Sequence, residues 1–201
     1  MTDITNDEQD ALDMARLREG HDAALGDLMT RHDERLFHYL IRQVQSEAEA
    51  ADLAQEAFVR VYLNRAKFDS RQKFSTWLYA IATNLSRDRL RWRTRHPQVS
   101  LDAEDEQSGA TLLQRLADPK PGPDERMETD ERAEAVRRAV AALPEELRTP
   151  LILAEYEGHS QAEIALILNC SAKAVEMRIY RARRQLRACL DELLAQERGR
   201  I

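Results

Sequence analysis

Helical periodicity fills this chain on both sides of one segment that is rich in proline, glycine and acidic residues. That segment, residues 98–130, contains the runs SLDAEDEQSGA and DPKPGPDE, a composition typical of a linker with little fixed structure. Before and after it, apolar residues recur at helical spacing, and strand-like alternation is nearly absent. The pattern predicts an all-α fold of two helical domains joined by a flexible acidic linker. The predicted parts are an acidic N-terminal segment (1–20), a first domain (21–97), the linker (98–130) and a second domain (131–195).

The first domain has three recognisable apolar stripes. The stretch LFHYLIRQV supplies the first, residues 47–67 supply the second, and TWLYAIATNLSRDRLRWR supplies the third. Ser75 is a suitable cap for the start of the third helix because its hydroxyl can accept from a free backbone N–H. The residues predicted to be buried are Leu36, Phe37, Leu40, Ile41, Val44, Leu53, Ala57, Phe58, Val61, Trp77, Leu78, Ile81 and Leu85.

Composition excludes several classes of protein. No apolar run approaches the roughly 18–20 residues that a membrane span requires, and the acidic N-terminus MTDITNDEQDALD is unlike a signal peptide, so we expect a cytoplasmic location. Cys170 and Cys189 stand outside any CxxC motif, and the histidines form no metal-binding spacing. Because phosphate-binding loops and nucleophile elbows are also missing from the sequence, we expect no metal, no cofactor and no enzyme activity.

Charge is segregated along the chain although the net charge is only −6. Residues 65–95 carry nine basic and two acidic side chains, and residues 171–187 carry six and one. Residues 1–34 and 100–131 each carry three basic and ten acidic side chains. Two basic segments separated by an acidic one indicate two contact surfaces for a polyanion, although a single basic segment can equally be a solvated helix face.

The second basic segment lies in a predicted helix-turn-helix. Ser160 caps QAEIALIL, Asn169 tolerates the left-handed conformation that ends a helix, and Ser171 caps the next helix. About three residues between two short helices is the spacing of this motif. The predicted shared core is Ile164, Leu168, Val175 and Ile179. The opposite side of the second helix carries Lys, Arg, Tyr and Met, a combination suited to the major groove and its phosphates.

Longer stretches on both sides of the linker resemble one family. The second domain, LPEELRTPLILAEYEGHSQAEIALILNCSAKAVEMRIYRARRQL, resembles region 4 of bacterial sigma factors. The stretches DLAQEAFVRVYLNRAKF and FSTWLYAIATNLSRDRLR resemble their region 2. Together they are similar to an extracytoplasmic-function (ECF, or group IV) sigma factor. The resemblance implies a protein that binds RNA polymerase core, directs it to promoters through −35 and −10 elements and promotes DNA melting.

The resemblance assigns one set of residues to polymerase and two sets to promoter DNA. For polymerase, the implied partners are the clamp helices of the largest subunit and the flap, and local geometry places the set on one face around the helix that buries Leu53. These polymerase-binding residues are Asp52, Gln55, Glu56, Val59 and Leu63. For the −10 element, the implied role is to hold a flipped-out base and the strand's phosphates. These residues are Phe68, Lys73, Ser75, Asn84, Arg87 and Arg91. For the −35 element, the residues are Lys173, Glu176, Met177, Tyr180, Arg181 and Arg184.

Three further points follow from the family or compete with it. An anti-sigma factor is a common partner in the family, and a membrane partner is not expected. A conventional helix-turn-helix activator or repressor would share the last domain, but it would not explain DxxQEAF or the FSTWLY helix. A helical adaptor or enzyme without DNA contacts is the second alternative, and it would be insensitive to loss of Arg181 and Arg184.

Overall fold

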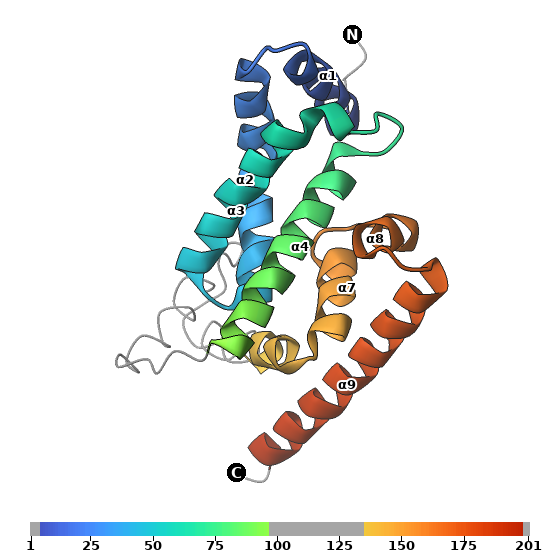
Figure 1. Cartoon of the computed structure of the whole chain (residues 1–201). Helices are drawn as coiled ribbons and strands as arrows, with labels where there is room; N and C mark the ends of the chain where they lie inside the picture. Colours follow the sequence, from blue (N-terminus) through green and yellow to red (C-terminus); the bar gives the residue numbers. More distant parts are fainter. Residues whose placement is uncertain (1–4, 97–134, 199–201) are drawn as a thin grey trace, which may run out of the picture.

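The structure, a computed structural model, describes residues 5–96 and 135–198, with only the backbone described for 192–198. The linker prediction for residues 98–130 lies outside this part of the chain. All regular structure in the described part is helical, which confirms the predicted all-α fold. The first half contains α1 (Asn6–Arg18), α2 (Ala23–Val44), α3 (Glu47–Asn64), the short 3-10 helix η1 (Arg65–Lys67) and α4 (Phe74–Arg95) (Figure 1).

Local capping signals explain where two of these helices begin. Thr5 and Glu8 form a capping box, in which the Thr5 hydroxyl accepts from the Glu8 N–H at 3.3 Å and the Glu8 carboxylate accepts from the Thr5 N–H at 2.9 Å. Ser46 accepts from the Glu49 N–H at 3.4 Å and starts α3. The preceding helix ends at Gln45, whose φ of 57° is left-handed. Short polar residues thus turn the chain between α2 and α3 within two positions.

Two expectations for the first half differ from the structure. The predicted helix cap at Ser75 is wrong, because α4 begins one residue earlier, after Lys73, and no side chain caps it. The acidic segment 1–20 contains α1, which packs against α2 and buries Met14 and Leu17. A buried ion cluster joins the two helices: Arg31 bonds Asp10 and also Asp13, the latter at 2.7 Å. The acids of this segment therefore serve the packing of the first domain.

The second half of the structure starts with helical residues 135–142 and continues with α7 (Glu145–Glu155), α8 (Gln161–Leu168) and α9 (Ala172–Arg198). The predicted helix-turn-helix is confirmed. Ser160 forms a capping box with Glu163, Asn169 adopts a φ of 48°, and the Ser171 hydroxyl accepts from the Ala174 N–H at 3.2 Å. The buried residues Ile164, Leu168, Val175 and Ile179 join α8 to α9 as predicted.

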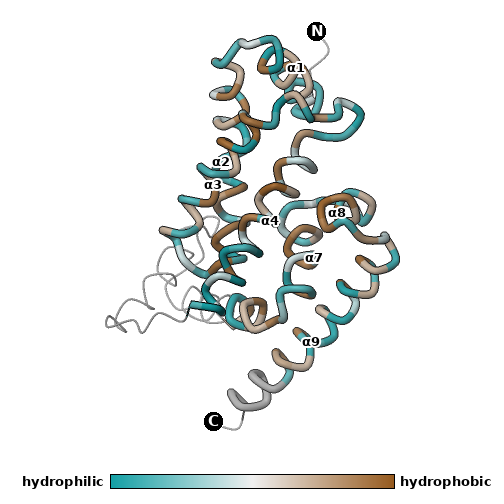
Figure 2. Tube along the Cα trace, viewed as in Figure 1, coloured by the Kyte–Doolittle hydropathy of each residue, from teal (hydrophilic) through white to brown (hydrophobic). Residues whose placement is uncertain are grey.

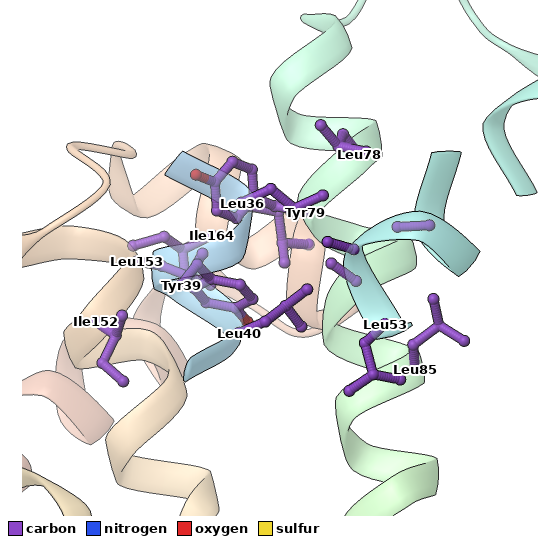
Figure 3. Close-up of a cluster of buried hydrophobic side chains, with 14 of the residues drawn as sticks. Leu36, Tyr39, Leu40, Leu53, Leu78, Tyr79, Leu85, Ile152, Leu153 and Ile164 are labelled. Atoms are coloured by element: carbon purple, nitrogen blue, oxygen red, sulfur yellow. The ribbon is translucent and has the colours of Figure 1, made fainter. Parts of the chain in front are cut away.

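One continuous hydrophobic core runs through both halves of the molecule. Helices α7 and α8 lie beside α2 and α4, and α9 extends away along α7 (Figure 1). Apolar residues colour most of α8, whereas α9 alternates between hydrophilic and apolar positions (Figure 2). In the close-up, Leu36, Tyr39 and Leu40 of α2 and Tyr79 of α4 gather with Ile152, Leu153 and Ile164 of the second half (Figure 3). The two halves are thus packed together as well as covalently linked.

Two kinds of site were searched for in the described residues. None of the described helices is long and apolar enough to cross a membrane. No group of three or more His, Cys, Asp or Glu side chains in residues 5–96 and 135–191 is placed to hold a metal ion.

Candidate nucleic-acid interface

We call the face formed by Lys173, Glu176, Met177, Tyr180, Arg181 and Arg184 the α9 face. All six residues are exposed, and the two large apolar side chains, Met177 and Tyr180, are 40% and 59% exposed. Behind them, Val175, Ile179 and Ala182 are buried against the rest of the motif. The helix therefore separates a buried stripe from an open face with basic, aromatic and apolar groups. This is the arrangement that a helix needs to enter the major groove.

Electrostatics divide the α9 face into a neutral end and a basic end. Near the N-terminus of the helix, Lys173 Nζ lies 2.9 Å from the Glu176 carboxylate, so these two charges offset each other. Farther along, Arg181 and Arg184 are exposed. Two neighbours do not belong to this face: Arg178 contacts the Cys170 sulfur at 3.7 Å, and Arg183 pairs with Glu155 of α7. The expectation that Arg178 pairs with an acid is therefore wrong.

We call the set Phe68, Lys73, Ser75, Asn84, Arg87 and Arg91 the α4 face. Asn84 and Arg91 are exposed, but Phe68 is only 5% exposed and packs against Phe74 and Trp77. Phe68 thus supports the loop that leads into α4 from beneath. That loop is fixed locally by Asp69, whose carboxylate accepts from the backbone N–H of Arg71 at 3.0 Å. The Arg71 guanidinium lowers the pKa of Asp69 to about 2 and keeps it charged.

Basic residues of the α4 face bond to acids of the second half of the chain. Lys73 Nζ lies 3.2 Å from Glu163 of α8 and 3.0 Å from Asp7 of α1, and both contacts raise its pKa. Arg87 Nε donates to Glu145 of α7 at 2.8 Å. The charge of the α4 face is therefore partly neutralised within the molecule itself.

A buried carboxylate lies at the centre of the junction between the halves. Glu157 follows α7 in the turn that Gly158, with a φ of +73°, lets the chain make before α8. Its side chain is 3% exposed and accepts a 2.6 Å hydrogen bond from the Tyr79 hydroxyl. Arg35 donates to the Glu157 backbone carbonyl at 3.0 Å, and the Arg42 guanidinium lies 3.8 Å from the carboxylate. Burial raises the pKa of Glu157, while Tyr79 and the two arginines oppose that rise.

Further polar groups line the same junction. The His159 ring lies edge-on to Tyr79 at 4.8 Å, and burial lowers the pKa of His159. Arg148 is 8% exposed and donates to the Gln43 carbonyl at the end of α2 at 3.1 Å. A polar cavity of about 220 Å³ opens between α1, α2, α4 and the turn before α8. Ser75 and Lys73 of the α4 face are among its lining residues, so this cavity borders the predicted strand-binding loop.

We call Asp52, Gln55, Glu56, Val59 and Leu63 the α3 face. All five are exposed, and Val59 and Leu63 are 50% and 69% exposed. The opposite side of α3 buries Leu53, Ala57 and Phe58, as the periodicity predicts. Apolar side chains that stay exposed beside polar ones mark a surface for a protein partner.

The contacts between the halves were not foreseen from the sequence. Tyr79 and Glu157 are separated by 78 positions, and neither stands in a motif that pairs them. Thr83 was expected on a strand-binding stripe, yet it is fully buried and hydrogen-bonded to Tyr39 at 2.7 Å. The one available signal was an excess of basic residues on the first domain and of acids in the second.

Comparisons with known proteins bring these three faces together in one family. The Sigma-70 region 2 model matches residues 28–96, and the Sigma-70 region 4 model matches residues 133–186. The chain is 34% identical to the ECF RNA polymerase sigma factor SigW of Bacillus subtilis, over 89% of this chain and 95% of the relative. It is 35% identical to the RNA polymerase sigma-H factor of Pseudomonas aeruginosa, over 93% and 96% of the two chains.

A solved structure shares the arrangement as well. CnrH, solved in complex with the cytosolic domain of CnrY, is 28% identical and matches with a TM-score of 0.67. The match covers 92% of this chain and 98% of CnrH. Similarity therefore extends through both halves, beyond the helix-turn-helix alone.

Proposed function

We propose that this chain, which belongs to the ECF family of RNA polymerase sigma factors, binds core RNA polymerase and directs it to promoters through two separated DNA contacts. Sigma factors act by binding, so no catalytic role is assigned to any residue. The observation that carries the proposal is the presence of both sigma regions, each with an exposed face of matching chemistry. A conventional helix-turn-helix regulator would account for α8 and α9 but would leave the α3 face unexplained.

The α3 face is assigned to the clamp helices of the largest polymerase subunit. Support comes from Val59 and Leu63, which stay exposed in a domain whose other large apolar residues on α3 are buried. Acidic and amide groups beside them, Asp52, Gln55 and Glu56, can bond to basic and backbone groups of a partner helix. Region 4 is assigned a second contact, with the polymerase flap.

The α4 face is assigned to the −10 element and to strand separation. Support comes from exposed Asn84, from Lys73, Arg87 and Arg91 as phosphate-binding cations, and from the cavity beside Ser75. Flipping a base out of the duplex costs a few kcal/mol, so a face that holds the exposed base both reads it and keeps the strands apart. Phe68 supports this loop without being exposed itself.

The α9 face is assigned to the −35 element. Arg181 and Arg184 supply donors for guanine edges or phosphates, Glu176 accepts from cytosine, and Met177 contacts a thymine methyl. Lys173 and Tyr180 complete the contact with the phosphate backbone. Work on polymerase and DNA places the protein in the cytoplasm, and the complex of CnrH with the cytosolic domain of CnrY supports an anti-sigma partner for this chain too.

A matched pair of exposed leucines tests the α3 assignment. Leu63→Ala should weaken binding to purified core polymerase about tenfold, because a central apolar anchor contributes more than about 1 kcal/mol. Leu12→Ala is the control, since Leu12 is 52% exposed on α1, away from the α3 face. Both variants should unfold within about 0.5 kcal/mol of the parent chain, because neither side chain is buried. Equal polymerase affinities for the two variants would contradict the assignment.

A further inference from the structure

Both promoter contacts cannot be made in the conformation described above. Elements centred near −35 and −10 lie about 25 base pairs apart, which is about 85 Å of duplex at roughly 3.4 Å per base pair. In the structure α8 packs directly against α4, and α9 is joined to α8 by a three-residue turn. The residues between 96 and 135, at up to about 3.5 Å each, reach at most about 130 Å, so the tether is long enough for the halves to separate.

The contacts that hold the halves together use residues of the α4 face. Lys73 bonds Glu163 and Arg87 bonds Glu145, and both acids belong to region 4. Between these two pairs along α4, the Tyr79 hydroxyl bonds Glu157. A carboxylate and a phosphate oxygen accept from the same donors with similar geometry. The three glutamates therefore occupy positions where strand phosphates would bind.

The polymerase-binding face is in a different situation. Asp52, Gln55, Glu56, Val59 and Leu63 are all exposed although the halves are packed together. Helix α3 packs against α2 and α4, on the side of the domain where Leu53 and Phe58 are buried. Packing of region 4 thus covers one functional face of region 2 and leaves the other open.

We infer that Glu145, Glu157 and Glu163 of region 4 form an internal clasp that occupies the strand-binding face of region 2 in the free protein and is released when polymerase is bound. This inference rests on the proposed function, since the α4 face is assigned there to the −10 strand. It adds an order of events: the free chain is open to polymerase and closed to the −10 strand. DNA engagement then follows polymerase binding.

Zero-length cross-linking detects the clasp directly. A carbodiimide joins an amine to a carboxylate in contact as an amide, and Lys73 offers two such partners, Asp7 at 3.0 Å and Glu163 at 3.2 Å. The Lys73–Asp7 link lies within region 2 and serves as the internal control. In the free full-length protein, mass spectrometry should find both links. Saturating core polymerase should remove the Lys73–Glu163 link and keep the Lys73–Asp7 link. A free protein that yields only the Lys73–Asp7 link would overturn the clasp.

A charge-matched pair of variants tests the masking. Glu145→Gln with Glu163→Gln should raise the affinity of the free protein for a fluorescein-labelled 20-nucleotide single strand of mixed sequence about fivefold. Two partly exposed ion pairs each contribute a few tenths to about 1 kcal/mol, and weakening them increases the binding-competent fraction. Glutamine keeps the size and hydrogen-bonding capacity of each side chain. The control, Glu146→Gln with Asp191→Asn, makes the same change in net charge at exposed positions of α7 and α9.

The two hypotheses fail in different ways. If both double variants raise strand affinity equally, net charge alone is responsible and the clasp is refuted, while polymerase binding is unaffected by that result. If the parent chain does not bind core polymerase at all, the sigma assignment fails, whatever the strand affinities are. Polymerase affinity should be the same within about twofold for Glu145→Gln with Glu163→Gln and for the parent, because the α3 face is already exposed.

Discussion

Removing one hydroxyl from the junction, with Tyr79→Phe, tests how the two halves are held together. Phenylalanine keeps the ring contacts with Tyr39 at 5.0 Å and with His159 at 4.8 Å, so the variant isolates the hydrogen bond to Glu157. That bond measures 2.6 Å, and the acceptor carboxylate is only 3% exposed, so water cannot readily replace the donor. A hydrogen bond to a charged group contributes about 1.5–3 kcal/mol. We expect the free energy of unfolding to fall by about 2 kcal/mol at pH 8.

The loss should depend on pH in a defined direction. Burial raises the pKa of Glu157, and the Tyr79 hydrogen bond opposes that rise, so Tyr79→Phe should raise it further. A raised carboxyl pKa makes the folded state relatively more stable as pH falls, and this stabilisation is complete below the unfolded value of about 4.5. At pH 4 only a neutral hydrogen bond is lost, which costs about 1 kcal/mol. The destabilisation should therefore be smaller at pH 4 than at pH 8.

Urea unfolding followed by tryptophan fluorescence measures this difference, because Trp77 and Trp92 both lie on α4. The reasoning would be refuted if Tyr79→Phe changed stability by less than about 0.5 kcal/mol at pH 8. It would also be refuted if the destabilisation grew as the pH fell. Either result would mean that the Glu157 carboxylate does not depend on the Tyr79 hydroxyl.

Three other perturbations address the DNA contacts and the buried histidine. Arg181→Ala should weaken binding of the polymerase complex to upstream promoter DNA by about 1–3 kcal/mol, as measured by gel shift with duplex fragments, and an unchanged affinity would remove Arg181 from the site. Asn84→Ala should slow promoter opening, followed by permanganate footprinting, more than it weakens initial binding; an equal loss of both contradicts the flipped-base role. Burial lowers the pKa of His159 from about 6.5, so its contribution to stability is complete above pH 6.5 and is lost as pH falls below that value. His159→Gln should therefore flatten the dependence of unfolding free energy on pH just below 6.5, whereas a variant with an unchanged slope would show that His159 is not the titrating group.

Local signals explain the parts of the fold that the sequence predicts well. Ser160, Asn169 and Ser171 specify the helix-turn-helix, because caps and left-handed turns depend on residues only a few positions apart. The buried sides of α3 and α9 follow from a 3.6-residue period in the same way. The exposed α3 and α9 faces are then what remains when the buried side has been subtracted.

Contacts between distant segments explain most of what the sequence did not predict. Asp10 and Asp13 look like surface acids until Arg31 and His32 of α2 are placed beside them. Thr83 looks suited to a nucleic-acid strand until Tyr39 and the packing of region 4 bury it. No period or motif links Tyr79 to Glu157, so only the tertiary structure brings this pair together. The Ser75 error is of another kind, since helix boundaries shift easily by one residue.

Transcription with purified components tests the central claim most directly. The protein would be mixed with sigma-free core polymerase and a library of genomic DNA fragments, and the transcripts would be sequenced. We predict specific start sites that require both components and share two upstream sequence elements separated by a fixed spacer. A protein that leaves core polymerase inactive, yet binds a DNA site on its own, would be a conventional regulator, and the roles assigned to the α3 and α4 faces would then be wrong.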